Sequence, residues 1–225
     1  AVGGKTGVNT RHGKNMVGAF YQPQLVFAAM GLLVTLDEDE FHSGLGEVVK
    51  HALLADAGLF ALCEQDAAAI RARQPAILTE VVAACVRIKA SVVVQDERES
   101  GWRAVLNLGH TVGHAIEATL IGTPRAIPHG LCVAIGLVAE TAWAERRGAC
   151  PVGTTARVEA LITALGLPQC PTGLDVAAVL AQVKFDKKVR RGKLQTAVVE
   201  GVGRVRLAEI DGAEVEGLFH SLPGF

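Results

Sequence analysis

Apolar residues recur at helical spacing along most of the chain from Asp37 onward. LDEDEFHSGLGEVVKHALLAD (36–56) begins with Asp37 at an N-cap position and acidic residues in the first turn. HGLCVAIGLVAETAWAERRG (129–148) ends in arginines followed by a glycine, and TTARVEALITALGLP (154–168) has a threonine N-cap and a Gly/Pro stop. The same spacing predicts further helices over 76–96, 175–188 and 215–222.

Strand-like patterns are limited to two stretches. QLVFA (24–28) lies in an N-terminal region that is otherwise punctuated by glycine and asparagine. LQTAVVEGVGRVRL (194–207) alternates like two strands that turn at Gly201–Gly203. The pattern therefore predicts a mainly α protein with a small β fringe.

Composition narrows the possible functions. Half of the 225 residues are hydrophobic and the net charge is −1, so no basic stripe for nucleic acid is indicated. The longest uncharged apolar run, Leu131–Ala139, is too short to cross a bilayer, and the first residues do not resemble a signal peptide. We expect a soluble, cytoplasmic protein without a nucleic-acid or membrane partner. Scattered cysteines without a CxxC pair indicate free thiols of a reducing compartment: Cys63, Cys85, Cys132, Cys150 and Cys170.

Three polar residues interrupt the apolar helix predicted over 36–56. Glu47, Lys50 and His51 stand at i, i+3 and i+4, which places a carboxylate and an ammonium close together on one face. A solvated helix face would explain them. The neighbouring SGLG and ALLA favour burial instead, where a carboxylate needs a cation or a metal.

A histidine pair in LNLGHTVGHAIE (106–117) raises a similar question. His110 and His114 share a face if this stretch is helical, as metal ligands, catalytic groups or core histidines. Asn107 before them and Glu117 after them favour a site. The HxxxH pattern lacks the adjacent glutamate of HExxH metalloproteases, so that hydrolase function is unsupported.

A third histidine, His129, stands where a proline and a glycine indicate a loop entering a helix. Glu47, His110 and His129 would make the three-ligand set of a catalytic zinc with an open position. Spacing alone leaves that set open against core histidines.

Basic residues are interleaved with these segments: Lys5, Lys14, Lys89, Arg103, Lys187 and Lys188. Around a cleft they would bind a phosphate and a carboxylate, although the last two also fit an exposed turn. GGKTGVN lacks the GxxxxGK(S/T) spacing of a nucleotide phosphate loop.

Several long strings, in order and at family-like spacing, resemble the 3-dehydroquinate synthase family. They are GGKTGVN (3–9), GKNMVGAFYQP (13–23), SGLGEVVKHALLAD (43–56), KASVVVQDERESGWRAVLNLGHTVGHAIE (89–117), HGLCVAIGLVAE (129–140) and DKKVRRGK (186–193). The resemblance implies a Rossmann-like NAD domain followed by a helical metal domain. This chain looks like the metal- and substrate-binding domain (37–225) preceded by the interdomain loop and a residual strand (1–36). Its start, AVGGKTGVN, lacks a methionine, and we expect an N-terminal half before it.

Matched position by position, the resemblance implies that Glu47, His110 and His129 hold zinc, with cobalt as an alternative. His114, Lys50 and Asn107 take catalytic roles, and His114 moves protons near the substrate phosphate. The implied substrate-binding residues are Lys5, Asn15, Lys50, Lys89, Arg103, Asn107, His114 and one of Lys187 and Lys188. The implied NAD contacts are Lys5, Lys14, Leu32, Thr35 and Glu40.

The chain departs mildly from the family pattern. Gly46 stands where alanine is usual, and Leu131 and Cys132 stand where Glu-Ala is usual. None of the implied ligands is replaced. The absence of the acid near His129 would, however, remove a polar partner that helps to orient this ligand.

The implied reaction converts 3-deoxy-D-arabino-heptulosonate 7-phosphate into 3-dehydroquinate and phosphate, in the shikimate pathway, with NAD regenerated in each cycle. The family also implies a homodimer. Another sugar-phosphate cyclase is an alternative that Asn107 and His114 disfavour. The glycerol dehydrogenase group is disfavoured by the basic residues and by KNMVGAFYQP. A third alternative is a metal- and anion-binding fragment that is inactive without its N-terminal half.

Overall fold

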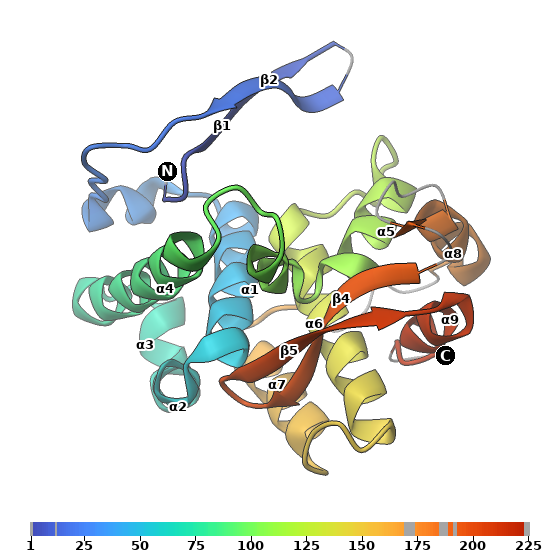
Figure 1. The fold of residues 1–225 in the computed structure, drawn as a ribbon. Helices are drawn as coiled ribbons and strands as arrows, with labels where there is room; N and C mark the ends of the chain where they lie inside the picture. Colours follow the sequence, from blue (N-terminus) through green and yellow to red (C-terminus); the bar gives the residue numbers. More distant parts are fainter. Residues whose placement is uncertain (1, 12, 169–173, 185–188, 191–192, 223–225) are drawn as a thin grey trace.

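The computed structural model describes residues 2–11, 13–168, 174–184, 189–190 and 193–222. Most of them lie in helices, which confirms the predicted mainly α fold with a small β fringe (Figure 1). The 3-10 helices η1 (Met30–Thr35) and η2 (Trp102–Asn107) precede α1 and α5. The α-helices are α1 (Glu38–Ala55), α2 (Ala57–Gln65), α3 (Ala67–Arg71), α4 (Pro75–Gln95), α5 (His110–Leu120), α6 (His129–Arg146), α7 (Thr154–Ala164), α8 (Val176–Lys184) and α9 (Gly212–Phe219).

Helix α6 runs through the middle of the helical body. Every residue from Gly130 to Thr141 is buried, and the helix packs against α1, α5 and α7 (Figure 1). A helix that is apolar on all sides belongs inside a core. Burial of each Val, Leu or Ile side chain contributes about 1.5–3 kcal/mol. α6 is therefore the element against which the other site helices are positioned.

Glycines let α6 approach its neighbours closely. A Cβ at Gly46 of α1 would overlap the carbonyl oxygen of Gly130 in α6, and a Cβ at Gly136 would overlap the carbonyl oxygen of Gly109. The first contact lies next to Glu47 and His129 in sequence. Close backbone packing thus sets the spacing between helices where the predicted ligands lie.

Six of the α-helices show two kinds of start. Asp37, Asp56 and Asp211 cap α1, α2 and α9 by accepting a backbone N–H of the first turn. α5, α6 and α7 begin after Gly109, Pro128 and Gly153, none of which supplies a side-chain cap.

Side chains from other helices cap these remaining starts. Ser43 of α1 accepts the Gly130 N–H at 3.0 Å. Glu145 of α6 accepts the N–H groups of Gly153 and Thr155 at 2.9 and 2.7 Å. The predicted threonine cap of α7 is therefore wrong: Thr154 is the first helical residue, and the carboxylate of Glu145 already satisfies this helix start.

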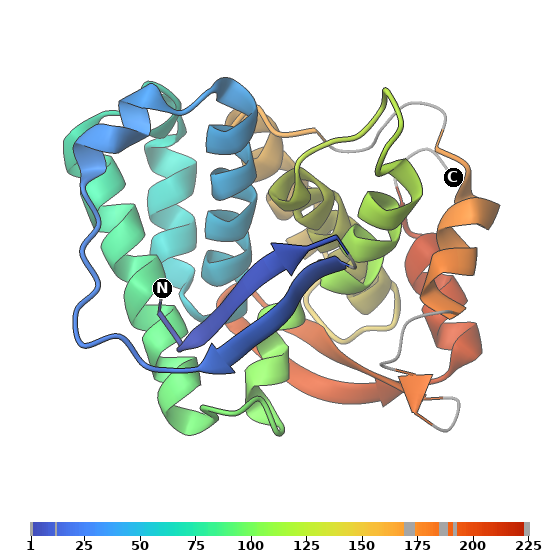
Figure 2. The ribbon, with the colours of Figure 1, turned by 90° about the horizontal axis from the view of Figure 1, so that it is seen from above.

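Strands β1 (Lys5–Thr10) and β2 (Gly13–Phe20) form an antiparallel hairpin. It projects above the helical body in Figure 1 and crosses over it in Figure 2. The strand predicted over 24–28 is wrong, because that segment forms no strand and Leu25 and Phe27 are 82% and 84% exposed. Among the described residues, no strand pairs with residues 24–28. β1 and β2 pair with each other instead.

A second antiparallel sheet has the order β3 (Val189–Arg190), β4 (Lys193–Gly201), β5 (Arg204–Ile210). The predicted turn at Gly201–Gly203 is confirmed, since Gly201 pairs with Arg204. β4 packs against α6 and η2. This sheet covers the body on the side that Figure 1 faces.

The described cysteines are free thiols, as predicted. Cys63, Cys132 and Cys150 are buried and Cys85 is half-buried, while Cys170 lies outside the described residues. Burial raises the pKa of Cys63 and of Cys85 to about 12.

Candidate metal and substrate site

The three predicted metal ligands come from three helices. Glu47 lies in α1, while His110 and His129 are the first residues of α5 and α6. Glu47 Oε1 lies 3.7 Å from His110 Nε2 and 3.6 Å from His129 Nε2. The structure therefore brings the three donor groups together around one point.

His114 lies in the same cluster. It stands one turn after His110 on α5, and one ligand atom from each of His110, His114 and His129 lies within 4.8 Å of the others. The centroids of the three imidazole rings are 5.0–5.4 Å apart. Four donors thus meet, and the choice of Glu47, His110 and His129 as the ligand set remains a prediction.

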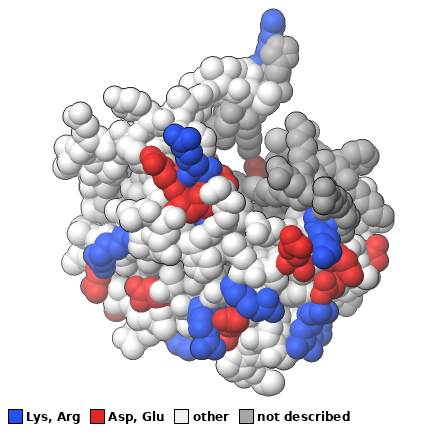
Figure 3. All heavy atoms as spheres, in the orientation of Figure 1, with Lys and Arg blue, Asp and Glu red and all other residues white. Residues whose placement is uncertain are grey.

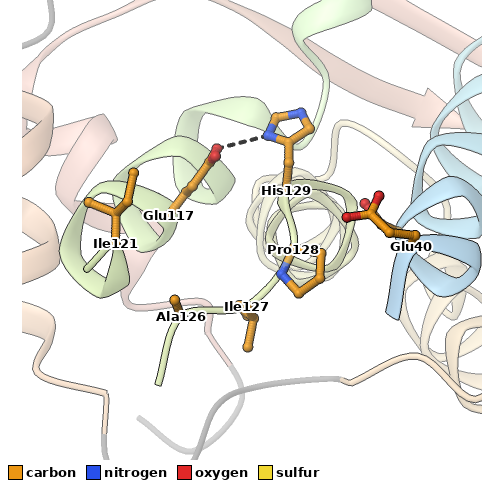
Figure 4. A pocket seen from close by; sticks show the side chains of 8 residues that line it. Glu40, Glu117, Ile121, Ala126, Ile127, Pro128 and His129 are labelled. Atoms are coloured by element: carbon orange, nitrogen blue, oxygen red, sulfur yellow. Dashed lines mark hydrogen bonds and ion pairs between the residues drawn. The ribbon is translucent and has the colours of Figure 1, made fainter. Parts of the chain in front are cut away.

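The Nδ1 atoms of His110 and His129, which point away from Glu47, each contact an oxygen atom of the protein. The ring of His110 contacts the Leu108 carbonyl oxygen through Nδ1 at 3.0 Å. The ring of His129 contacts Glu117 Oε2 through Nδ1 at 2.8 Å (Figure 4). Such contacts leave Nε2 toward Glu47 and are typical of histidines that bind metal. Glu117 also supplies His129 with a carboxylate, although Leu131 stands where the family pattern has an acid.

Lys50 brings a buried positive charge next to Glu47. Its Nζ lies 2.6 Å from Glu47 Oε2, and the residue is only 5% exposed. Burial alone would raise the pKa of Glu47, but the interactions with His129 and Lys50 outweigh it and hold the pKa far below its usual range. The buried-face interpretation of Glu47, Lys50 and His51 is thus supported over a solvated face.

The histidines differ in their ionisation. Burial and the charge of Lys50 lower the pKa of His110 to about 3, so its imidazole is neutral, as a metal ligand must be. The nearby carboxylate of Glu47, together with that of Glu117, raises the pKa of His129. His51 contacts the backbone carbonyl of Glu47 at 2.7 Å, and burial lowers its pKa to about 4.

The predicted substrate residues divide into two groups. Lys89 of α4 lies close enough to the cluster that, besides burial, the charge of Lys50 lowers its pKa. Asn107 is half-buried at the end of η2, just before α5. Arg103 is 2% exposed, and its guanidinium donates to the carbonyl oxygens of Glu97 and Gly3 at 2.5 and 3.0 Å.

Other predicted residues lie in the N-terminal segment or outside the described chain. Lys5 pairs with Glu99 at the base of the hairpin. Lys14 and Asn15 belong to β2, but their side chains lie outside the described atoms, as do Lys187 and Lys188. The structure therefore leaves their roles as predictions.

The predicted NAD contacts are separated as well. Leu32 and Thr35 lie exposed in η1, and Leu32 is 66% exposed. Glu40, in the first turn of α1, lines a cavity of about 330 Å³ with Glu117 and His129 (Figure 4). Of these three residues, Glu40 is the one that lines this cavity with His129, a member of the donor cluster.

Arg73 holds the η1 segment in place. Its guanidinium donates to the carbonyl oxygens of Leu33 and Leu36 at 3.1 and 2.6 Å and stacks over the ring of Phe41. Arg73 has a positive φ of 55°, which is rare for residues other than glycine, asparagine and aspartate.

Two carboxylates near the site were missed from the sequence. Asp96 accepts the backbone N–H groups of Ser100, Gly101 and Arg103, and these bonds lower its pKa to about 2. Glu140 is 2% exposed within α6. A lone acid inside the apolar run of that helix was the available signal for Glu140.

The face of the molecule in Figure 3 shows no large patch of a single charge over the described residues. In Figure 3 basic and acidic side chains lie side by side over the described residues. Among the described helices, none is both long and apolar enough to cross a membrane.

Comparison with known proteins identifies the family. The family model described as "3-dehydroquinate synthase C-terminal" matches residues 44–189, and "3-dehydroquinate synthase N-terminal" matches residues 1–43. The chain is 44% identical to a 3-dehydroquinate synthase of Geobacter sp. strain M21, covering 93% of this chain and 58% of the relative. It is 43% identical to that of Rhodopseudomonas palustris strain BisA53, covering 98% and 60%. The chain therefore spans about three fifths of the length of these relatives.

Solved structures of related cyclases share the fold. The 2-epi-5-epi-valiolone synthase of Streptomyces hygroscopicus subsp. jinggangensis 5008, with NAD+ and Zn2+ bound, superimposes with a TM-score of 0.83 at 27% identity. The match covers 98% of this chain and 61% of that one. A 2-deoxy-scyllo-inosose synthase complexed with carbaglucose-6-phosphate, NAD+ and Co2+ gives 0.82 at 26% identity, covering 96% and 61%. With the family matches above, these findings show that the chain belongs to the 3-dehydroquinate synthase family.

Proposed function

We propose that this chain supplies the metal- and substrate-binding part of a 3-dehydroquinate synthase. The reaction converts 3-deoxy-D-arabino-heptulosonate 7-phosphate into 3-dehydroquinate and phosphate. The observation that carries the proposal is the convergence of Glu47, His110 and His129 beside the buried ammonium of Lys50, in a chain of this family. A homodimer and a cytoplasmic location remain expectations from the family.

The donor set fits a divalent metal such as zinc or cobalt. Imidazole nitrogens and a carboxylate oxygen are ligands that zinc accepts, and three protein ligands leave a position for substrate. Two of the imidazoles are already held through Nδ1 by Leu108 and Glu117. When bound, the metal would act as a Lewis acid on a substrate oxygen.

The protein side chains then bind and orient the substrate. Lys50 and Lys89 contribute ammonium charge for the phosphate or the carboxylate. The two backbone contacts of Arg103 use two of the five N–H donors of a guanidinium, so the same group can also bind an anion. His114 lies beside the rings of His110 and His129, and we propose that it transfers protons to or from the substrate.

We propose NAD as the second cofactor, in part from the relatives solved with NAD+. Leu32, Thr35 and Glu40 would form one side of its site, and residues outside this chain would complete it. Holding reactants in position is worth about 7–11 kcal/mol of a barrier. The isolated chain should therefore bind zinc and, weakly, the sugar phosphate, with poor NAD affinity and negligible turnover.

The experiment measures phosphate release from the heptulosonate phosphate, with and without NAD and zinc. The 225-residue chain is tested alone and together with the N-terminal half of the Geobacter relative. Release is expected only from the combination, and only with both cofactors. Steady release by the chain alone would contradict the shared-site proposal, and no release from the combination would contradict the proposed reaction.

A second candidate is another sugar-phosphate cyclase, which the likeness to the two solved cyclases favours. Calorimetry with the heptulosonate phosphate and with carbaglucose-6-phosphate separates the two. If the protein is a dehydroquinate synthase, the heptulosonate phosphate should bind more tightly than carbaglucose-6-phosphate. Tighter binding of carbaglucose-6-phosphate would support the alternative.

A further inference from the structure

A buried carboxylate from α6 closes the start of α5. Glu140 is 2% exposed, and its two oxygens accept the backbone N–H groups of Gly109, Thr111 and Val112 at 2.8, 3.1 and 3.4 Å. A buried charge is costly unless polar groups compensate it. Here several N–H groups at the positive end of a helix do so. The carboxylate therefore fixes these backbone groups rather than merely occupying the core.

Helix α5 depends on this acceptor because its own N-cap residue offers none. Gly109 has a positive φ of 75° and no side chain. Its carbonyl oxygen lies against Gly136 of α6, one turn before Glu140, where a Cβ would overlap it. The turn that carries His110 is thus fixed by the α6 backbone and by the Glu140 carboxylate.

The same helix also carries another predicted ligand. His129 is the first residue of α6, and Glu140 lies three turns further along that helix. One rigid element therefore presents His129 and holds the backbone of His110. Any shift of the first turn of α5 against α6 changes the distance between the two imidazoles.

We propose that Glu140 is a positioning residue for the metal cluster: its carboxylate sets where the His110 imidazole stands relative to His129 and Glu47. The inference rests on the proposed metal site. It assigns Glu140 no contact with metal or substrate. Its effect passes through the backbone of the first turn of α5.

An ordinary helix cap is the alternative explanation, and the chain contains a matched control. Glu145, also on α6, accepts the N–H groups of Gly153 and Thr155 at the start of α7. Gly153 also has a positive φ and no cap of its own. α7 carries none of the four clustered donors. Loss of the Glu145 cap should therefore cost stability without moving a ligand.

The test compares E140Q and E145Q in the 225-residue chain. Zinc affinity is measured by calorimetry, the ligand field by visible absorption of the Co2+ form, and stability by thermal unfolding. E140Q should bind zinc about 10–100-fold more weakly, as expected when an outer partner of a ligand is removed. Its Co2+ spectrum should also change. E145Q should lose stability but keep the wild-type zinc affinity and spectrum.

A second variant covers the case in which E140Q does not fold. E140D keeps the charge but is one methylene shorter, so zinc affinity between those of the wild type and E140Q is expected. Wild-type affinity and spectrum in E140D or E140Q would overturn the inference. An equal loss of affinity in E145Q would also overturn it. Failure of the wild-type chain to bind zinc would contradict the proposed metal site itself, and this inference with it.

Discussion

The helical body and the N-terminal hairpin follow opposite packing rules. Val49 and Leu53 of α1 are fully buried, whereas Val17 and Phe20 of β2 are 61% and 55% exposed. The predicted metal donors all lie in the body, while Lys5, Lys14 and Asn15 lie in the hairpin. The body can therefore assemble its cluster from its own packing. The hairpin and the residues next to it contact the body at the loop that follows α4 and at η2.

That loop is where the two regions meet. Gln22 donates to Glu97 at 2.8 Å, and Lys5 pairs with Glu99. Arg103 donates to the Gly3 carbonyl. Substitutions in the body should consequently act on metal binding and stability, whereas those in the hairpin should act on neither.

The largest expected effect separates the two histidines of α5. His110→Ala should weaken zinc binding by more than about 100-fold, because a direct ligand matters more than an outer partner. His114→Ala should keep zinc affinity within about tenfold and lose turnover when the N-terminal half is supplied. Calorimetry and phosphate release measure the two effects. Equal loss of zinc in both variants would favour His110, His114 and His129 as the ligand set.

The next prediction concerns the contact between α1 and α6. Gly46→Ala, the residue usual in the family, should destabilise the fold by about 1–3 kcal/mol, because its Cβ overlaps the Gly130 carbonyl. Gly44→Ala is the control on the same helix, since its Cβ meets nothing within 4 Å. It should stabilise the chain by up to about 1 kcal/mol. Denaturant unfolding that ranks the two variants the other way would contradict the close contact.

The loop that follows α4, where the hairpin meets the body, should lose stability in acid. Backbone hydrogen bonds lower the pKa of Asp96 from its usual 3.8 to about 2. Because the folded pKa lies below the unfolded one, ionised Asp96 stabilises the fold above about pH 4, and this contribution is lost as pH falls toward 2. Asp96→Asn should lower stability at pH 7 and flatten its pH dependence in that window. An unchanged slope between pH 4 and 2 would contradict the assignment.

The smallest effect is expected in the hairpin. Val17→Ala should change the free energy of unfolding by no more than about 0.5 kcal/mol, as is usual for exposed positions. The buried Val49→Ala should cost more than about 1 kcal/mol, from the buried methyl groups that it removes. A cost for Val17→Ala as large as that for Val49→Ala would show that the exposed face of the hairpin is covered in solution.

The body was also easier to predict from sequence than the hairpin. Helical periodicity and the Asp37 cap predicted α1, because both signals are local. The turn at Gly201–Gly203 was predictable for the same reason. The hairpin of β1 and β2 was missed, since its strands lack an apolar alternation and are held by pairing with each other.

The site was only partly predictable. Spacing placed His110 and His114 on one face and left Glu47, His110 and His129 open as a ligand set. Only the family resemblance favoured that set over core histidines. A lone acid in an apolar run could have marked Glu140, but the contacts that Glu140 and Glu145 make at the starts of α5 and α7 were not predictable. Glu140 and Glu145 reach helices far from them in sequence, and no local pattern records such a contact.

These borrowed caps have a consequence for how the chain folds. The bond between Ser43 and Gly130 closes 87 residues, and that between Glu140 and Gly109 closes 31. Contacts of such separation form only after the loops between them have closed, which slows folding. The donor cluster cannot exist in a nascent α5 or α6 alone, so a metal that binds it selects the completed fold. Each tenfold rise of free zinc above its dissociation constant would then add about 1.4 kcal/mol to the stability of that fold. If zinc is the metal that binds, its supply would affect the lifetime of the protein.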